Sequence, residues 1–267
     1  TSVAGEKVGS RALTLVAAGD IARRPSDGRG TARLIASIDP DAVLALGDNA
    51  YENGSLSDYR RNYDPTWGRF KKITRPVPGN HEYRTRGAAG YLAYFDRQVD
   101  GRSYYAWDAG HWRMYALSCG IDCGAGSRQL AWLRQDLAAN ADRPALAYVH
   151  EPLYTCSTRH PPTRRLSAVW SVLQRADGRI MLAGHNHAYE RFAKQDATGR
   201  RSADGLRQFV VGTGGVALYP VRSSCRNRLA AQDDTSGVLV LRLGPERFSW
   251  RFVAVSGQVL DRGRGRS

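Results

Sequence analysis

Side chains that commonly bind metal ions gather in six short segments that lie far apart in this chain. Five of the six histidines fall in these segments. Their oxygen and nitrogen donors are numerous enough for two ions, and two ions about 3.5–4 Å apart can activate a water and hold a phosphoryl group. The sequence therefore predicts a binuclear phosphoester hydrolase. The segments are Gly19-Asp20, Gly47-Asp48-Asn49-Ala50-Tyr51, Gly79-Asn80-His81-Glu82, Val149-His150, Gly184-His185-Asn186-His187 and, as the weakest, His160.

The segments differ in how strongly each one indicates a metal site. A Gly-Asp pair after a strand is common as a turn, so Asp20 or Asp48 alone would more often be structural. A lone His150 would usually be an interior histidine with satisfied hydrogen bonds. His185 and His187 are the strongest signal, because two histidines at i and i+2 after a tight turn can reach two adjacent ions. The occurrence of all the segments in one chain carries the prediction.

Buried strands are predicted to deliver these segments. The apolar runs over 13–18, 42–46, 145–149 and 179–183 have the length and composition of such strands. A helix over 31–38 lies between the first two, which makes a βαβ unit and predicts that those strands are parallel. Loops at the carboxyl ends of parallel strands converge, so ligand sites form there. The metal-binding segments are therefore expected at one edge of a sheet.

Further helices and a short strand are predicted between these runs. Helices are expected over 56–70 and 88–95, with a short strand entering Pro76-Val77-Pro78 between them. Ser127 is the predicted N-cap of another helix, whose leucines at 130, 133 and 137 share one face. These helices would cover the faces of the sheet.

The remaining strands are expected to be antiparallel. Residues 104–108 and 112–117 form a predicted hairpin, so His111 falls in its turn and is not expected to be a ligand. Strands are also predicted over 209–211, 237–243 and 248–255.

The elements together predict an α/β fold of two packed sheets flanked by helices. No linker or repeat divides the chain, so residues 1–267 are expected to form a single catalytic domain. Residues 1–11 and 260–267 are expected to be irregular tails.

The positive charge of the chain fits an anionic ligand. There are 39 Lys+Arg against 25 Asp+Glu, which gives a formal charge of +14, and arginine supplies nearly all of it. A positive field concentrates anions, which suits the small phosphorylated substrates expected of a phosphoester hydrolase, but the same charge would also suit nucleic acid or a cell surface. Nucleic acid is not expected as a specific partner, because the arginines are spread along the chain without a recognisable binding module. A generally basic, solvated surface is the simpler explanation of the charge and is favoured, so the charge alone identifies no partner. No apolar run approaches the roughly 18 residues that span a bilayer.

Four cysteines permit three pairings. We predict Cys119–Cys123 and Cys156–Cys225, which implies an oxidising compartment. The chain begins at Thr1, so removal of a secretory signal is expected, with a secreted or periplasmic location. Four buried free thiols are the alternative.

These motifs resemble those of the calcineurin-like metallophosphoesterases and, among them, the purple acid phosphatases. The superfamily's first motif is Asp-x-His, whereas here it reads Asp20-Ile21-Ala22. Purple acid phosphatases also lack that histidine and carry a tyrosine three residues after the bridging aspartate, as Tyr51 follows Asp48. The stretch 184–191 is similar to that family's extended last motif. The resemblance covers about 13–255 and implies a compact, four-layer αββα sandwich.

The resemblance implies a ligand set for each ion. Asp20, Tyr51 and His187 would bind the first metal, Asn80, His150 and His185 the second, and Asp48 would bridge them. The ligands that would bind only the first ion include a carboxylate and a phenolate, whereas the ligands that would bind only the second ion are neutral. Hard anionic donors favour Fe(III), while imidazole and amide groups suit a divalent ion such as Fe, Zn or Mn. The sequence thus predicts two different ions.

Two further histidines are the catalytic candidates. His81 adjoins a ligand, so we expect it to stabilise the transition state or to protonate the leaving group. His160 lies ten residues after His150, where purple acid phosphatases carry a substrate-binding histidine, although the surrounding loop is dissimilar. A plain surface histidine is the alternative there. Glu82 and Glu151 are expected to orient Asn80 and His150.

Three functions remain open at this point. The favoured one is a purple acid phosphatase-like phosphomonoesterase that releases inorganic phosphate. A phosphodiesterase or nucleotidase on the same scaffold is the second, because a fold does not fix the substrate. A non-catalytic, basic phosphate-binding module is the third.

Overall fold

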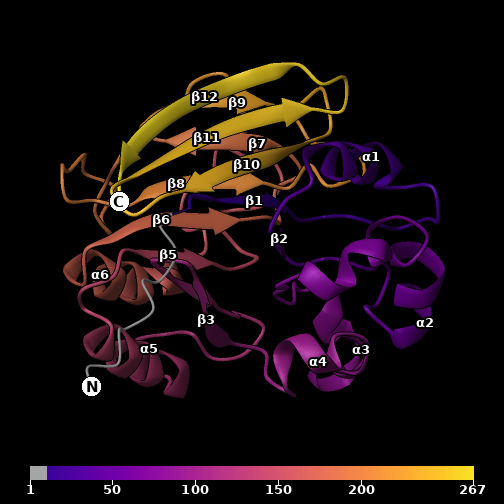
Figure 1. Cartoon of the computed structure of the whole chain (residues 1–267), viewed down its shortest axis with the longest axis horizontal. Coiled ribbons are helices and arrows are strands. Elements are labelled where there is room, and N and C mark those ends of the chain that lie inside the picture. Colours follow the sequence, from indigo (N-terminus) through magenta and orange to yellow (C-terminus); the bar gives the residue numbers. More distant parts are fainter. Residues whose placement is uncertain (1–10) are drawn as a thin grey trace, which may run out of the picture.

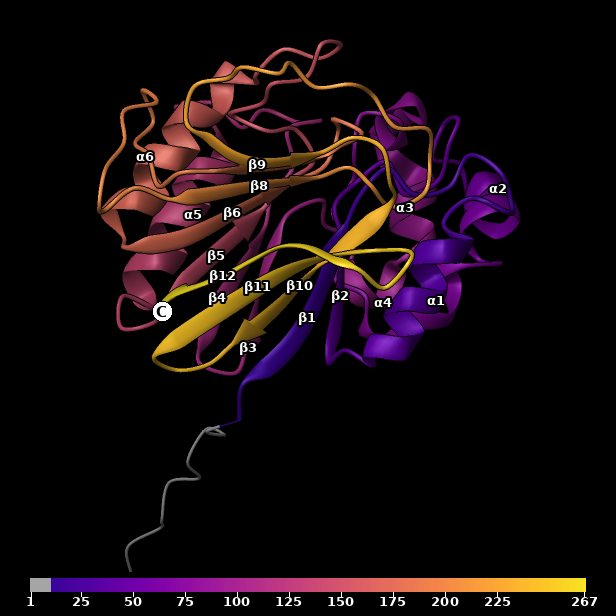
Figure 2. The same ribbon diagram turned by 90° about the horizontal axis from the view of Figure 1, so that it is seen from above.

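Two β-sheets packed face to face form the centre of the molecule, and helices flank them (Figures 1 and 2). The computed structural model describes residues 11–267. One sheet has five strands in the order β12-β11-β10-β1-β2. The pair β1/β2 is parallel and its other pairs are antiparallel. The strands are β12 (Val259–Arg266), β11 (Arg247–Ala254), β10 (Gly237–Leu243), β1 (Leu13–Ala18) and β2 (Ala42–Ala45).

The second sheet has seven strands in the order β3-β4-β5-β6-β8-β7-β9. Its centre, from β4 to β8, is parallel, and the pairs at its two edges are antiparallel. The strands are β3 (Tyr105–Ala109), β4 (Trp112–Ala116), β5 (Ala145–Tyr148), β6 (Gly178–Ala183), β8 (Arg207–Val211), β7 (Tyr189–Phe192) and β9 (Arg228–Gln232).

Three longer helices flank the sheets. The helices α5 (Arg128–Ala139) and α6 (Ser167–Arg175) pack on each other beside the seven-stranded sheet, and α1 (Arg29–Ile38) packs on β10. The connection between β2 and β3 is built from short helices (Figure 1). They are α2 (Leu56–Asp58), α3 (Ala89–Tyr94), α4 (Asp96–Val99), a π-helix at Tyr59–Tyr63, and 3₁₀ turns at Trp67–Ile73, Glu82–Arg84 and Arg86–Ala88; a further 3₁₀ turn, Arg164–Leu166, precedes α6.

Strands covered on both faces have continuous apolar sequences. On β6, Ile180 and Leu182 point into the core between the sheets, while Met181 packs with the helices. On β5, Leu146 likewise points into the core between the sheets, and Ala147 packs with the helices. Such burial produces unbroken apolar runs rather than alternation, which is why these strands could be recognised in the sequence.

The structure confirms the predicted α/β fold of two mixed sheets flanked by helices. The strands β1 and β2 are parallel and joined by a helix. The hairpin β3/β4 places His111 in its turn. The Ser127 side chain caps α5 by accepting a hydrogen bond from the Leu130 N–H at 3.1 Å.

Other predictions need correction. The helix over 56–70 is broken into an α-helical turn, a π-helix and a 3₁₀ helix. The strand entering Pro76-Val77-Pro78 makes only isolated bridges from Thr74 and Val77. Strand β8 pairs in parallel with β6, so it does not belong to an antiparallel carboxyl-terminal part. The predictions omitted α6, β7 and β9.

The predicted irregular tail over 260–267 is wrong, because Val259–Arg266 forms β12. Alternating arginine and glycine residues do not have the composition of a typical strand, so the sequence did not indicate one. In the structure the glycines of this strand lie against aromatic rings of β11. A Cβ at Gly263 would lie 2.2 Å from the Trp250 ring, and one at Gly265 would lie 2.5 Å from the Phe248 ring. The rings therefore fill the space that side chains of β12 would otherwise occupy. The predicted tail over 1–11 lies, apart from its last residue, outside the described residues.

Candidate metal centre

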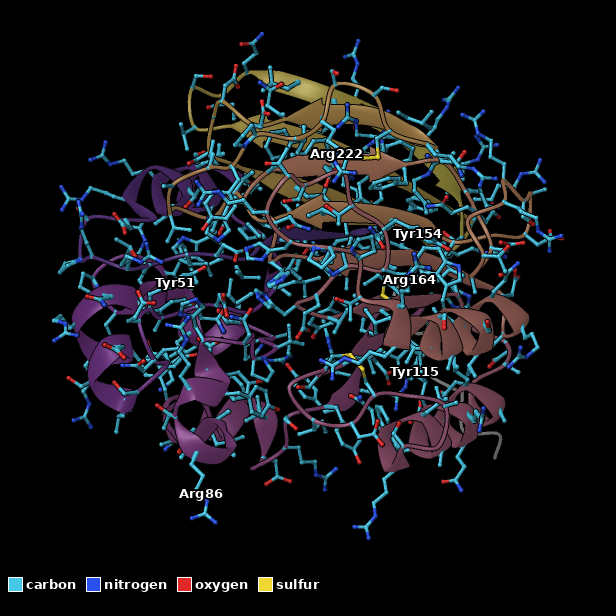
Figure 3. The ribbon with its side chains drawn as sticks, turned by 180° about the vertical axis from the view of Figure 1, so that it is seen from behind. Tyr51, Arg86, Tyr115, Tyr154, Arg164 and Arg222 are labelled. Carbon is cyan, nitrogen blue, oxygen red and sulfur yellow. A yellow bond between two sulfur atoms is a disulfide. The ribbon has the colours of Figure 1, made fainter. Side chains whose placement is uncertain are left out.

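Four strands deliver most of the predicted metal ligands to one region. Asp20 follows β1, Asp48 and Tyr51 follow β2, His150 follows β5, and His185 and His187 follow β6. Asn80 lies in the loop after the bridge between Leu46 and Val77. Figure 3 shows Tyr51 beside the helical region that follows β2, whereas Tyr154 and Arg164 lie toward α6.

The three ligands predicted for the first metal are in mutual contact. The Tyr51 hydroxyl donates a hydrogen bond to Oδ1 of Asp20 at 3.0 Å. Nε2 of His187 lies 3.3 Å from the Tyr51 hydroxyl and 3.3 Å from Oδ1 of Asp20. All three side chains are buried. A phenol, a carboxylate and an imidazole therefore point their donor atoms at one place.

The ligands predicted for the second metal form an adjacent group. Nε2 of His150 lies 3.2 Å from Oδ1 of Asn80 and 3.2 Å from Nδ1 of His185. The same Nε2 atom lies 3.3 Å from Oδ2 of Asp48. One carboxylate, one amide oxygen and two imidazoles therefore converge here.

The two groups adjoin each other. The His185 backbone N–H donates to Oδ2 of Asp20 at 2.8 Å, so a residue of the second group contacts a residue of the first. One donor atom from each of Asp20, Asp48 and His150 lies within 4.8 Å of the other two. This donor set fits metal ions, because seven buried or half-buried ligand groups would otherwise bring their lone pairs together without a cation.

Glycines precede several of the predicted ligands because the loops approach each other closely. A Cβ at Gly47 would lie 2.6 Å from Nδ1 of His150, and one at Gly79 would lie 2.2 Å from Oδ1 of Asp48. Asp20, Asp48 and His185 have positive φ angles of 61°, 48° and 68°. Such backbone conformations cost energy outside glycine and cluster at functional sites.

Glu82 ties the loops of the centre together. Its carboxylate accepts four backbone N–H groups, those of Asp48 at 2.9 Å, Asn49 at 3.0 Å, Ala50 at 3.2 Å and Gly79 at 2.7 Å. Burial, and then the nearby negative charge of Asp48, raise the pKa of Glu82 to about 7. These contacts fix the loop that carries Asp48. Glu82 was expected to orient the Asn80 side chain, but it binds the backbone of residues 48–50 and 79 instead.

Backbone carbonyls orient two of the histidines. Nδ1 of His150 lies 2.9 Å from the Leu46 carbonyl, and Nδ1 of His187 lies 2.7 Å from the Ala217 carbonyl. In each ring Nε2 is left to face the centre, an arrangement typical of metal-binding histidines. Glu151, which was expected to orient His150, lies instead 3.8 Å from Arg165.

The protonation of the histidines bears on metal binding. Burial, and then the positive charge on His150, lower the pKa of His185 to about 3, so its imidazole is neutral at pH 7. Burial opposes the charged form of His150, but the Asp48 carboxylate outweighs it and raises the pKa of His150. Metal ligands must be deprotonated, so metal binding would release a proton from His150.

Both catalytic candidates line a pocket of about 270 Å³ that opens onto the centre. The His81 backbone N–H donates to Oδ1 of Asp48 at 2.8 Å, and its ring Nε2 lies 3.8 Å from Oδ2 of the same residue. Nδ1 of His81 lies 2.6 Å from the Glu52 carbonyl. The His160 ring lies 4.4 Å from the His185 ring. The structure thus brings both histidines to the pocket.

Four residues of this pocket wall carried no signal in the sequence, namely Arg23, Glu52, Arg84 and Tyr219. Tyr219 stacks on His187 with ring centroids 4.0 Å apart, and Arg23 lies over the Tyr51 ring at 4.9 Å. Glu52 pairs with Arg23 at 3.2 Å and also with Arg84. Tyr219 lies in an irregular segment without a local motif, so only the fold brings it here.

The comparison with known families identifies the chain. The sequence profile described as Calcineurin-like phosphoesterase matches residues 13–189, more than half of the chain. The chain belongs to this family. Purple acid phosphatase 23 of Arabidopsis thaliana is 28% identical over 193 residues, covering 57% of this chain and 42% of that protein. Purple acid phosphatase 22 of the same plant is 26% identical over 207 residues, covering 68% of this chain and 45% of that protein.

Solved structures agree on the fold of this calcineurin-like phosphoesterase. The purple acid phosphatase PPD1 from yellow lupin (Lupinus luteus) seeds superposes with a TM-score of 0.78 at 19% identity, covering 96% of this chain and 54% of that one. GAP50, the anchor in the inner membrane complex of Plasmodium, gives 0.74 at 13% identity, covering 96% and 89%. One neighbour is a phosphatase and the other an anchor, so the fold alone does not establish catalysis. The chain spans less than half the length of the two plant relatives matched by sequence.

Two further predictions concern the cysteines and the membrane. The disulfides Cys119–Cys123 and Cys156–Cys225 are both present, as predicted. Among residues 11–267, no helix combines the length and apolar character needed to cross a bilayer.

Proposed function

We propose that this chain is a binuclear metal-dependent phosphoester hydrolase that acts as a purple acid phosphatase-like phosphomonoesterase and releases inorganic phosphate. The observation that carries the proposal is the convergence of two adjacent ligand groups, Asp20/Tyr51/His187 and Asn80/His150/His185, with Asp48 at their junction. The purple acid phosphatases among its relatives support this choice.

The donor chemistry supports two different ions. Fe(III) suits the first group, because a carboxylate and a phenol that can ionise are hard anionic donors. A divalent ion, Fe, Zn or Mn, suits the amide and imidazoles of the second group. When bound, such a pair activates a water and neutralises charge on the phosphoryl group. Asp48 lies within reach of the second group and is held by Glu82 through the backbone, so it is positioned to bridge.

The histidines at the pocket supply the proton chemistry. His81 would donate a proton or a hydrogen bond to the oxygen of the departing alcohol, since its Nδ1 is engaged by the Glu52 carbonyl and its Nε2 faces Asp48. His160 would bind the phosphate ester. The cations Arg23 and Arg84 at the rim would draw anionic substrates toward it.

The size of the pocket supports small substrates. A volume of about 270 Å³ is near the lower limit for small-molecule sites, so a monoester fits better than a nucleic acid chain. The two disulfides support a location in an oxidising compartment, outside the cell or in the periplasm.

Metal analysis and substrate comparison test the proposal. Protein purified without added metal is expected to contain two ions per chain, one of them iron, with a visible absorption band from tyrosinate bound to Fe(III). It should hydrolyse an aryl phosphate faster than an aryl phosphodiester. Faster hydrolysis of the diester would support the phosphodiesterase alternative, and metal without any hydrolysis would support the binding module.

A further inference from the structure

A second cavity, of about 460 Å³, opens at the opposite end of the sheets from the metal centre. Arg179 and Arg207 lie near the starts of β6 and β8, whereas the metal-binding loops follow the ends of the parallel strands. The six residues of β6 separate the two regions by about 20 Å at a rise of ~3.3 Å per residue. In Figure 1 the carboxyl terminus, beside the cavity, marks this end of β6, away from its arrowhead.

Cationic side chains dominate the wall of this cavity. Arg179, Lys194, Arg207 and Arg266 line it, and Asp204 is its one acidic residue. Arg179 is paired with Asp177, but its buried Nε atom has no hydrogen-bond partner in the part of the chain that the structure describes.

The other three cations have no counterion among the described residues. Within residues 11–267, no carboxylate lies within 4.0 Å of Lys194, Arg207 or Arg266. Lys194 and Arg207 are only partly exposed. Partly buried charges are normally paired, so this group is short of negative charge.

The cations also lie close enough to repel one another. Burial, and then the positive charge of Arg179, lower the pKa of Lys194, and Arg207 contributes in the same direction. Burial, and then Arg191, lower the pKa of Arg207. An anion in the cavity would relieve this repulsion.

Packing holds the cavity in place before any ligand arrives. The Arg207 guanidinium lies 5.0 Å from the centre of the Trp250 ring, and it donates a hydrogen bond to the Phe192 carbonyl at 3.3 Å. Lys194 donates a hydrogen bond to the Ala203 carbonyl. Phe248 and Gly265 close one side, where a Cβ on the glycine would collide with the ring. A preorganised site loses less entropy on binding.

We propose that this cavity is a second anion site, which binds a compact ligand carrying at least two phosphate groups. Arginine offers forked N–H donors that match phosphate oxygens, and lysine adds a point charge. The volume lies within the range of small-molecule sites. A single phosphate would reach only part of the wall, so a chain of phosphates is the better match.

Calorimetric titration of the metal-loaded protein with inorganic tripolyphosphate tests this proposal. The buffer contains excess orthophosphate, which occupies the metal centre and competes for any site that a single phosphate satisfies. Saturable binding of one tripolyphosphate per chain is expected. Arg207→Gln and Lys194→Met should each weaken it at least about tenfold, because each removes a charge-assisted contact. Hydrolysis of an aryl phosphate should stay unchanged in both variants.

Two controls distinguish binding in this cavity from binding at the metal centre and from attraction to the basic surface as a whole. Arg97→Gln, an exposed change of the same charge on α4, should leave the affinity unaltered. Asp48→Asn should retain tripolyphosphate binding even where it abolishes hydrolysis, so failure of the proposed enzyme function would not affect this result. Absence of saturable binding, equal affinity in Lys194→Met and Arg97→Gln, or loss of binding in Asp48→Asn would each overturn the proposal.

Discussion

The Tyr51 hydroxyl donates a hydrogen bond to the Asp20 carboxylate at 3.0 Å, in the interior of the protein. Burial, and then the negative charges of Asp20 and Asp48, raise the pKa of Tyr51 above its usual range. Without a cation the phenol therefore stays protonated. A strongly charged metal ion bound there would reverse this balance and favour the phenolate, so the ionisation state of Tyr51 would indicate whether such an ion is bound.

Tyr51→Phe is expected to abolish the visible absorption band of the iron-loaded protein, because it removes the phenolate that donates charge to Fe(III). The ring would keep its packing 4.3 Å from His81, so the fold should persist. Tyr63→Phe is the matched control, since that buried hydroxyl has no hydrogen-bond partner among residues 11–267 and lies outside the predicted ligand set. Absorption spectra with iron analysis provide the measurement. An unchanged band in Tyr51→Phe would remove Tyr51 from the ligand set.

His81→Asn is expected to lower kcat by about 10²–10⁴-fold, because a positioned general acid contributes an effect of that size. The content of both metals should stay the same, since His81 is predicted to act on the leaving group. Steady-state kinetics on an aryl phosphate and elemental analysis check the two statements. His111→Asn, in the exposed β3/β4 turn, is the control and should have parental activity. Loss of metal from His81→Asn would instead make the residue a ligand or a support for one.

His160→Ala is expected to raise KM about tenfold with a smaller effect on kcat, because a residue that binds substrate and transition state equally affects KM. Burial, and then the positive charge of His187, lower the pKa of His160, so its neutral ring offers a hydrogen bond at pH 7. The measurement is the KM for an aryl phosphate at pH 7. Unchanged kinetics would identify His160 as a wall residue without a role in binding substrate.

Local sequence patterns carried the prediction of the metal-binding region. Buried parallel strands have unbroken apolar runs, and the glycines at 47 and 79 mark places where ligand loops touch. Candidate metal-binding residues that follow such runs could therefore be identified from the sequence alone. Tyr219 and Arg23 carry no such signal, because each reaches the pocket through the folding of distant segments.

The strands that escaped prediction depend on tertiary contacts. In β12 the glycines at 263 and 265 look like those of a flexible tail, yet they accommodate Trp250 and Phe248. Residues 189–191 were not predicted to form a strand. They form part of β7, and the Glu190 carboxylate accepts the Cys156 N–H at 2.9 Å. Periodicity within a single segment contains no information about such partners.

Asp261, on β12, accepts four hydrogen bonds, three of which join the two sheets. From β7, the Tyr189 hydroxyl donates to its carboxylate at 2.6 Å, and Arg191 donates twice, at 2.7 and 2.8 Å. The Trp250 indole of β11 donates at 3.2 Å. Burial disfavours the charged form, but the hydrogen bonds from Arg191 and Tyr189 outweigh it and lower the pKa of Asp261.

Asp261→Asn is expected to reduce the free energy of unfolding by about 1–3 kcal/mol at pH 7, because it breaks charged hydrogen bonds. A lowered folded-state pKa gives stability that is present above the unfolded value, near 3.9, and is lost as the pH falls through the folded value. The difference between parent and variant should therefore shrink below about pH 4. Urea unfolding of chelator-treated protein at pH 7, 5 and 3.5 measures it without a contribution from metal release. Asp142→Asn, at an exposed aspartate that forms no ion pair within residues 11–267, should show no such trend. A difference in the Asp261 variant that stays constant down to pH 3.5 would show that its effect comes from packing and not from the carboxylate charge.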